Sequence, residues 1–590
     1  MSKSIYIRAL VAIILHFPFE GHSQEKYDFV WLLGYPPNKP LLYVGGNYID
    51  FKHGTPDIQY FDIPYDLNQP TIMSDSTGSL QFYTSGCNII NKEHNIMDNG
   101  DDINPGFYHN YWCDENSAGY LSYQGILSLP MPGQSGKYIL FHHRRYQFKD
   151  SIDVMYTLID MNTNNGLGKV TEKNKILQYG WLSRTFQAVR HGNGRDWWVV
   201  IPQEDADIYN FYLLDPEGIH GPYVQQVSAS WIPGQYYNLM CAFSPDGSKF
   251  VRLGGDQPAA FRMYDFDRCT GVLSNPVTIA VPDTTMYASW ACFSPNSRYL
   301  YLTNEVERLY QYDTEAPDIS ASVQLIGQYD GFLSVYNLPT GLHTMTLAPD
   351  NRIYMSSANG VNVLHTIHNP DLPGAACDFR QHDILLPAHI LFFLPNNPFF
   401  RLYNMKDSPC DTLNIQPPLV AFWRSEPDSL AGPLAMSFTD LSYYQPVTWQ
   451  WDFGDGTGST ERSPAHVFPA PGNYTVCLTV CNESGVCDTL CREIEIVTTG
   501  ASVPVPPGAL PVQVYPNPAT GWLWVLHDDM DEESTFTLMN STGQIVVNRR
   551  LVAGSRVDGV DLSGLPVGIY FWEVEAGGIP KGIGRILMQR

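Results

Sequence analysis

Short apolar runs separated by turns rich in Gly, Pro, Asp and Asn make up most of the chain before residue 405. The clearest copies are Phe243-Ser-Pro-Asp-Gly-Ser-Lys-Phe-Val251, Phe293-Ser-Pro-Asn-Ser-Arg-Tyr-Leu-Tyr301 and Leu347-Ala-Pro-Asp-Asn-Arg-Ile-Tyr-Met355. In each copy, an apolar residue precedes a Pro-containing turn and a run of strand-forming residues. This pattern predicts a β-hairpin. The same region shows no helical periodicity of useful length.

The hairpin pattern recurs at a nearly constant interval. Looser copies lie upstream, and the turn positions fall 58, 58, 53, 50 and 54 residues apart, at Gly78, Gly136, Gly194, Gly247, Ser297 and Asn351. A strand repeat of roughly 40 to 55 residues is typical of one propeller blade. Residues 24–405 are therefore predicted to form a β-propeller, with seven blades favoured over six because the terminal segments can supply one more. The last apolar run, 384–394, is expected to pair with the N-terminal strands.

The first 23 residues are predicted to be a secretory signal peptide. Lys3 and Arg8 precede the apolar run 9–15, and Gly21 and Ser23 supply the small residues of a cleavage site before Gln24. This run is too short to span a bilayer, and no other stretch is long and apolar enough for a transmembrane helix. The mature protein is expected to be exported, with no transmembrane span.

The composition limits which classes of molecule the protein is expected to bind. The formal net charge is −25, from 60 acidic and 35 basic residues. This argues against nucleic acid, whose phosphates are neutralised by Lys and Arg. The 36 Tyr, 28 Phe and 13 Trp residues favour an all-β fold with aromatic side chains packed in strands, although some could form surfaces that stack on sugars.

The spacing of four of the 11 cysteines predicts how they pair. Cys477 and Cys481 share one face of a strand, as do Cys487 and Cys491. A hairpin turning around Ser484 would place Cys477 opposite Cys491 and Cys481 opposite Cys487, at about 4.5 to 5.5 Å between Cα atoms. We therefore predict both disulfides, and a Cys₄ metal site is the alternative. The pairing of the other seven cannot be assigned: Cys87, Cys113, Cys241, Cys269, Cys292, Cys377 and Cys410.

A second unit is predicted at 415–498, after a linker at 406–414. It contains Trp449-Gln-Trp-Asp-Phe-Gly-Asp-Gly456 and the alternating run Gly472-Asn-Tyr-Thr-Val-Cys-Leu-Thr-Val480. These phrases predict a small immunoglobulin-like β-sandwich. The region resembles the polycystic-kidney-disease (PKD) type domain, which implies a spacer or a weak binding module. Asp452 and Asp455 could bind Ca²⁺ or could accept hydrogen bonds from turn amides, as Asp does in tight turns. No other cofactor is expected.

A Pro-rich linker is predicted at 499–510, followed by a third unit at 511–590. Its short strands and turns predict another small sandwich. It contains Val514-Tyr-Pro-Asn-Pro-Ala-Thr-Gly521 and Leu565-Pro-Val-Gly-Ile-Tyr570 and ends on Arg590. The unit closely resembles the C-terminal sorting domain of proteins exported by the type IX secretion system. This resemblance implies contact with that secretion machinery and a location at the outer-membrane surface or in the medium.

The predicted propeller also resembles secreted bacterial propellers related to WD-type repeats. The resemblance rests on the Ser-Pro hairpins and on three further phrases: Ser74-Asp-Ser-Thr-Gly-Ser-Leu-Gln-Phe-Tyr-Thr-Ser-Gly86, Ala188-Val-Arg-His-Gly-Asn-Gly-Arg-Asp-Trp-Trp198 and Tyr264-Asp-Phe-Asp-Arg-Cys-Thr-Gly271. It implies a fold but no defined activity, because propellers carry both binding and catalytic sites. The whole chain is thus predicted to be all-β, a propeller followed by two small sandwiches.

The chain contains no nucleophile elbow, zinc-protease motif or phosphate-binding glycine loop. The best polar and aromatic cluster is a candidate ligand groove at a blade top, with stabilisation of the hairpin turn as the alternative: Arg190, His191, Arg195, Asp196, Trp197 and Trp198. We expect a secreted or surface-anchored binding protein for an extracellular glycan or protein. The alternatives are a secreted propeller enzyme acting on polysaccharide or peptide and a purely structural role. Paired carboxylates or a cation in the central channel would favour the enzyme.

Overall fold

The structure is a computed structural model, and several segments of the chain are not described. The predicted signal peptide 1–23, the predicted linker 499–510 and the predicted first-blade strand at 41–44 lie outside the described residues. Within them, no helix is long and apolar enough to cross a membrane. The described residues are 25–36, 45–115, 119–122, 124–147, 149–204, 206–227, 240–253, 260–282, 288–304, 306–334, 338–428, 431–496, 512–515, 519, 522–526, 534–540, 544–551, 557–562, 564–566, 568–577 and 579–588.

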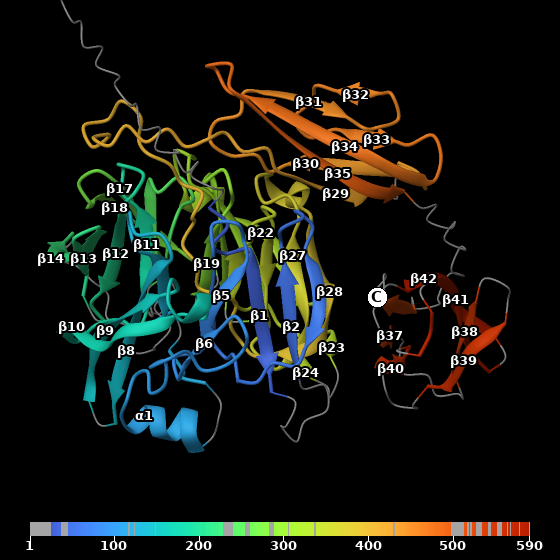
Figure 1. Cartoon of the computed structure of the whole chain (residues 1–590), viewed down its shortest axis with the longest axis horizontal. Coiled ribbons are helices and arrows are strands. Elements are labelled where there is room, and N and C mark those ends of the chain that lie inside the picture. The colour runs from blue at the N-terminus through green and yellow to red at the C-terminus, as the bar shows by residue number, and fades with distance from the viewer. Residues whose placement is uncertain are drawn as a thin grey trace, which may run out of the picture.

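Seven antiparallel sheets, each built from consecutive strands, form a β-propeller of seven blades (Figure 1). The first strands of most neighbouring blades contact one another around the centre. A strand pair β23 (Leu333–Ser334) and β24 (Leu338–Pro339) lies between the last two blades in sequence. The blades are β1 (Val30–Tyr35), β2 (Gly45–Asp50) and β3 (Asp57–Phe61); β4 (Thr71–Ser74), β5 (Leu80–Thr84) and β6 (Ile89–Asn91); β7 (Leu127–Pro130), β8 (Lys137–Tyr146), β9 (Lys149–Asp160) and β10 (Lys169–Gly180); β11 (Gln187–Arg190), β12 (Trp197–Pro202), β13 (Ile208–Asp215) and β14 (Gly218–Gln226); β15 (Cys241–Phe243), β16 (Lys249–Leu253), β17 (Ala260–Asp267) and β18 (Val272–Ala280); β19 (Ala288–Phe293), β20 (Tyr299–Asn304), β21 (Arg308–Asp313) and β22 (Gln324–Gln328); and β25 (Met345–Leu347), β26 (Ile353–Met355), β27 (Val361–Ile367) and β28 (Phe379–Ile390).

The six repeated turns connect the first and second strands of six blades and share one backbone conformation. In the copy at 243–251, the Ser244 hydroxyl donates to Asp246, and the Asp246 carboxylate accepts the Ser248 amide at 2.9 Å. The repeated turn position has a left-handed backbone in every copy, which explains why Gly, Asn or Ser is found there. The φ angles are 89° at Gly78, 72° at Gly136, 81° at Gly194, 71° at Gly247, 65° at Ser297 and 62° at Asn351.

The ring closes differently from the expectation. The run 384–390 belongs to β28, which pairs with β27 of its own blade and not with an N-terminal strand. Each blade is complete from one continuous segment, so no blade needs a strand from the other end of the chain. Side chains close the ring instead: the Asn47 amide donates to Ala388 O at 3.0 Å, and its oxygen accepts the Ala388 amide at 2.9 Å.

The PKD region folds into two facing sheets, which lie above the propeller in Figure 1. Its core includes Trp423, Phe438 and Trp451. Both predicted disulfides are present in the hairpin of β34 and β35, with Cα–Cα distances of 4.0 Å for Cys477–Cys491 and 4.1 Å for Cys481–Cys487. The strands are β29 (Trp423–Pro427), β30 (Ala435–Asp440) and β33 (Ala465–Val467) in one sheet, and β31 (Thr448–Asp452), β32 (Gly458–Ser459), β34 (Gly472–Cys481) and β35 (Cys487–Ile496) in the other.

The propeller and the PKD region are packed against each other. Phe422 and Leu441 belong to the same apolar cluster as Phe29 and Trp31 of the first blade. Beside this cluster, Glu426 of β29 accepts ion pairs from Arg352, from Arg424 at 2.7 Å and from His368 at 3.8 Å. Shared apolar burial together with buried ion pairs makes a defined interface between the two units.

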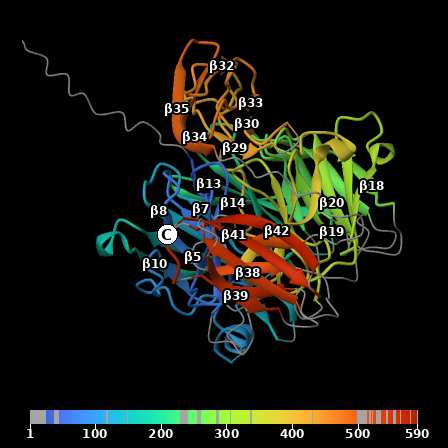
Figure 2. The same ribbon diagram turned by 90° about the vertical axis from the view of Figure 1, so that its right-hand side faces the viewer.

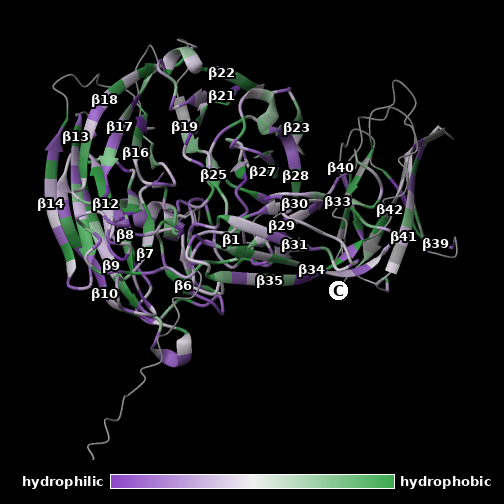
Figure 3. Ribbon diagram, turned by 90° about the horizontal axis from the view of Figure 1, so that it is seen from above, coloured by the Kyte–Doolittle hydropathy of each residue, from purple (hydrophilic) through white to green (hydrophobic). Residues whose placement is uncertain are grey.

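The third unit is also a two-sheet sandwich, and Figures 1 and 3 show its sheets facing each other. Its core is drawn entirely from its own residues, including Leu523, Phe536, Tyr570 and Ile586. The strands are β36 (Gln513–Tyr515), β37 (Trp522–Leu526) and β40 (Val557–Asp561) in one sheet, and β38 (Ser534–Asn540), β39 (Ile545–Arg550), β41 (Gly568–Ala576) and β42 (Ile579–Met588) in the other.

Candidate functional site

The six residues of the candidate groove lie at the hairpin between β11 and β12. Their side chains do not line one surface, because neighbouring residues of a strand point to opposite faces. Trp197 is buried in the core around the third and fourth blades, whereas Trp198 is buried in the core between the fourth and fifth. Neither tryptophan is available to a ligand in this fold.

The polar members of the same cluster bind the protein itself. Arg190 lies over the ring of Trp197 at 4.2 Å and donates to Glu25 at 2.6 Å. Arg195 and Asp196 pair at 2.7 Å, and Asn193 donates to the same carboxylate at 2.6 Å. These contacts hold the hairpin turn and the start of the chain, which is the alternative role that the sequence left open.

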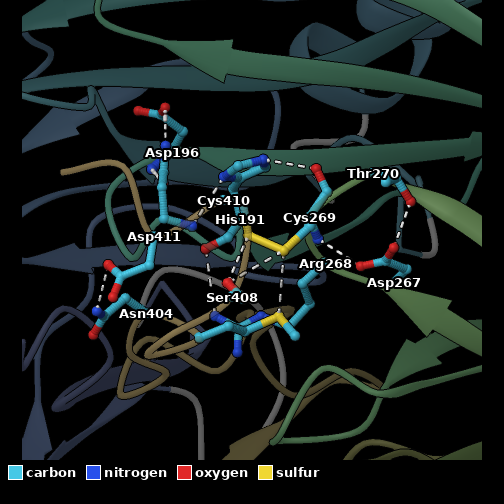
Figure 4. Close-up of a disulfide and its surroundings, with 12 residues drawn as sticks. His191, Asp196, Asp267, Arg268, Cys269, Thr270, Asn404, Ser408, Cys410 and Asp411 are labelled. Atoms are coloured by element: carbon cyan, nitrogen blue, oxygen red, sulfur yellow. Dashed lines mark hydrogen bonds between the residues drawn. A yellow bond between two sulfur atoms is a disulfide. The ribbon is translucent and has the colours of Figure 1, made fainter. Parts of the chain in front are cut away.

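A disulfide fastens the segment after the propeller to the turn between β17 and β18, beside this hairpin (Figure 4). Cys269 and Cys410 are bonded, with 5.4 Å between their Cα atoms, although 406–414 was expected to be a linker. His191 Nε2 lies 3.0 Å from Cys269 O. Arg268 donates to Arg190 O at 2.8 Å and to Tyr403 O. The top of the fourth and fifth blades is therefore a covalently fixed structure. The remaining pairing is Cys87–Cys113, and Cys241, Cys292 and Cys377 are buried and free.

Residues 392–399 of the segment 391–405 lie against the inner strands of several blades, at the centre of the propeller. Asn396 is its anchor: its amide donates to Gln124 O at 3.1 Å, Ile126 O at 3.3 Å and Phe186 O at 3.2 Å, and its oxygen accepts the Gln187 amide at 2.7 Å. These partners lie in or next to the inner strands of the third and fourth blades. Asn396 thus ties this segment to two neighbouring blades.

A cavity of about 90 Å³ remains beside this segment, between the inner strands of the fourth to seventh blades. Asp28 is the one carboxylate among the described residues of its lining, and it pairs with buried Arg401 at 2.7 Å. The free Cys292 also lines it, but burial raises the pKa of this thiol to about 12, so it is protonated and weakly nucleophilic. The described lining contains no carboxylate pair of the kind that glycoside hydrolysis requires.

A second, open cleft of about 550 Å³ lies between the hairpins of the fifth and sixth blades and residues 399–406. Asp246, Arg268, Arg401 and Lys406 are among its lining residues. Burial lowers the pKa of Arg268 to about 10, which leaves it charged at neutral pH. Arg268 already donates to backbone carbonyls, and Arg401 is paired with Asp28. Its arginine donors are therefore used to hold the fold.

The two candidate calcium ligands stabilise turns of the PKD region. Asp452 accepts the Gly454 amide at 2.9 Å. Asp455 accepts the Thr457 amide at 2.9 Å, and its second oxygen lies 2.8 Å from His466 Nε2. In the part of the chain that the structure describes, no group of three or more His, Cys, Asp or Glu residues could hold a metal ion.

Comparison with known proteins assigns the two C-terminal units. Residues 513–589 match the family model of the secretion system C-terminal sorting domain, which belongs to the type IX system. This chain carries a type IX sorting domain. It also matches the PKD domain model over residues 421–497.

The matches to individual proteins either cover a short part of this chain or have low sequence identity. Over 39 residues, the chain is 51% identical to collagenase ColA of Bacillus cereus, a match that covers 7% of this chain and 4% of the collagenase. A PKD1 domain from Vibrio anguillarum Epp is 30% identical over 13% of this chain and 93% of that one, with a TM-score of 0.12. A structure described as a putative 6-phosphogluconolactonase from Bacteroides uniformis is 12% identical, covers 62% of this chain and 99% of that one, and has a TM-score of 0.35.

Proposed function

We propose that this protein is a binding protein, displayed on the outer-membrane surface or released. Its propeller would recognise an extracellular ligand, and its PKD domain would act as a spacer. The observation that carries the proposal is the central segment 391–405, which is held by Asn396 in the channel where a propeller enzyme would place its reacting groups. A structure that packs its own chain against the inner strands of its channel is suited to recognition on an outer surface.

The electrostatics of the channel support the same function. General acid and base catalysis needs a titratable group that is positioned and free to exchange protons. Asp28 is committed to Arg401, and the Cys292 thiol is protonated. The channel is therefore poorly equipped for hydrolysis of either a glycosidic or a peptide bond.

The contact between the PKD domain and the propeller supports a rigid spacer. Glu426 bridges Arg352 and His368 of the propeller and Arg424 of the PKD domain, next to an apolar cluster that both units share. Such a contact would hold the propeller in one orientation relative to the PKD domain. A fixed orientation presents the same propeller face to the surroundings in every copy.

The test is to apply the purified mature chain to an array of glycans and extracellular proteins and to read the array twice. Saturable binding with the printed ligand retained after incubation is the expected result. Loss of the printed ligand during incubation would instead identify an enzyme. Absence of both binding and loss would contradict the proposal and favour a structural role.

A further inference from the structure

Exposed aromatic side chains gather at one end of the propeller. Most aromatic residues are buried between blades, as the sequence favoured. Four of the described exposed rings, however, come from two places. Two lie in the loop between β6 and β7, which contains α1 (Phe107–His109) and the helical turn Asn110–Glu115, and two lie at the end of β10. The exposed fractions are 44% for Phe107, 42% for Tyr111, 57% for Tyr179 and 60% for Trp181. We call this set the ring surface.

The two halves of the ring surface are joined by residues of β8 and β9. Arg145 lies over the ring of Tyr108 at 4.3 Å, next to Phe107 in α1. Its neighbour Arg144 lies 5.5 Å from the ring of Tyr146, which itself lies 6.3 Å from the ring of Tyr179. Because Arg144 and Arg145 are adjacent in β8, these contacts bring α1 and Tyr179 of β10 to the same end of the third blade.

The surface is held in place before any ligand arrives. The disulfide Cys87–Cys113 fastens the loop between β6 and β7 to the second blade, and buried His109 lies 2.7 Å from Ile103 O. The rings of Phe107 and Tyr111 are nearly parallel, with 9° between their planes. On the other half, the Tyr179 hydroxyl lies 2.9 Å from Ser151 Oγ. Rings fixed in this way lose little conformational entropy when they bind.

The polar groups between the rings favour a neutral partner rich in hydroxyls. Arg144 donates to Asp153 at 3.0 Å, and the Tyr146 hydroxyl donates to the same carboxylate at 2.8 Å. Nearby, Lys173 is paired with Asp101 at 3.0 Å. Charges of both signs alternate, so the surface has no single-sign field to attract an ionic ligand. The core of a protein interface is, in contrast, depleted of charged residues.

Resting on the proposed binding function, we propose that the ring surface binds a neutral glycan. Phe107, Tyr111 and Trp181 would stack on the apolar faces of sugar rings, and the tyrosine and arginine groups between them would bond to sugar hydroxyls. The surface lies at the end of the propeller opposite to the PKD domain, as α1 and β29–β35 show in Figures 1 and 2.

The experiment uses the full mature chain and the variants Trp181→Ala and Tyr111→Ala. Tyr60→Ala and Tyr223→Ala are matched controls, because these tyrosines are each 49% exposed on other blades. The probes are cellulose, chitin, a β-1,3-glucan and starch, with polygalacturonate as a charged comparison. We expect binding to at least one neutral glycan to weaken about tenfold in each ring-surface variant, as for the loss of one aromatic contact, and to remain unchanged in the controls. Trp181→Phe should retain most of the affinity.

The other outcomes separate this inference from the proposed function. Neutral-glycan binding that is equal in all variants would overturn the ring surface and leave the binding function standing. Binding only to polygalacturonate or only to a protein would overturn the neutral-glycan inference and again leave the binding function standing. No binding to any glycan or array protein would overturn both. Circular dichroism of each variant checks that a loss of binding is not a loss of fold.

Discussion

At the scale of single residues, a few partly buried polar side chains decide how distant segments meet. Asn396 satisfies carbonyl groups from two blades, and Glu426 neutralises cations from two domains. Both side chains join segments that share no backbone hydrogen-bond ladder. A polar group of this kind stabilises the fold only while all its partners are present.

Replacing Asn396 should loosen the centre of the propeller. Asn396→Leu keeps the size of the side chain but leaves three carbonyl groups and the Gln187 amide without this partner. We expect a loss of about 1 to 3 kcal/mol in the free energy of unfolding, measured by urea denaturation. Asn359→Ala is the control, because its amide bonds Pro339 O at 2.8 Å near the surface, and it should change stability by less than about 0.5 kcal/mol. Equal effects would show that Asn396 is not the anchor.

Removing the charge of Glu426 should weaken the contact between the propeller and the PKD domain. Arg352 and Arg424 are buried, so Glu426→Gln leaves two cations poorly compensated. We expect a loss of about 1 to 3 kcal/mol in thermal unfolding of the full chain, discounted because the Glu426 side chain is 33% exposed. Asp378→Asn, which breaks the exposed pair with Arg380, should have a much smaller effect.

The same residue gives the interface a pH dependence of known sign. Burial alone would raise the pKa of Glu426, but Arg352, Arg424 and His368 hold this pKa below its ordinary value of 4.5. A lowered pKa in the folded state contributes stability that is complete above 4.5 and is lost as the pH falls below it. The difference in melting temperature between wild type and Glu426→Gln should therefore shrink on acidification below pH 4.5. A difference that grows there would show that Glu426 is not ionised in the contact.

At the scale of elements, the local pattern of the sequence was sufficient wherever partners are close along the chain. The turns from Gly78 to Asn351 could be predicted because a left-handed position has its own residue preference, and they mark six of the seven blades. The hairpin disulfides could be predicted from strand register alone. The bridges Cys87–Cys113 and Cys269–Cys410 span 26 and 141 residues, and no local rule relates such distant positions.

The candidate site was harder to predict from the sequence for the same reason. The alternation of a strand already indicates that Trp197 and Trp198 point to opposite faces, but it does not show that both faces are buried. The sequence did not predict that the segment 391–405 contacts the inner strands, because the partners of Asn396 lie more than 200 positions upstream. The exposed rings of the ring surface come from two separate parts of the chain, around 107–111 and 179–181, and only the fold brings them together.

The length of the closed loop predicts which disulfide matters most. In the chain-entropy model, a cross-link spanning 141 residues is worth about 5 kcal/mol, and one spanning 6 residues about 2 kcal/mol. Cys269→Ser with Cys410→Ser should therefore lower the midpoint of denaturation more than Cys481→Ser with Cys487→Ser. Guanidinium titration of both double variants provides the measurement, with the wild type as reference. The reverse order would mean that the segment around Cys410 is held by hydrogen bonds and not by the disulfide.

At the scale of the whole molecule, the proposed recognition unit and the sorting domain are separate units. The propeller and the PKD domain share an apolar cluster and a buried ion network, whereas the core of the sorting domain consists of its own residues. A unit with its own core can be removed without opening the core of the others. The sorting domain should therefore be dispensable for folding and for ligand binding.

This separation leads to a prediction about export. Deleting 511–590 should leave the protein in the periplasm, because the match at 513–589 is to the domain that the type IX machinery recognises. The retained protein should still unfold cooperatively and bind its ligand with unchanged affinity, since the two other cores are intact. Cell fractionation and surface protease accessibility measure the location, and a fusion of 497–590 to a periplasmic reporter is the converse control. Surface display of the truncated chain would show that another segment carries the export signal, and a truncated chain that fails to fold would show that the sorting domain supports the rest.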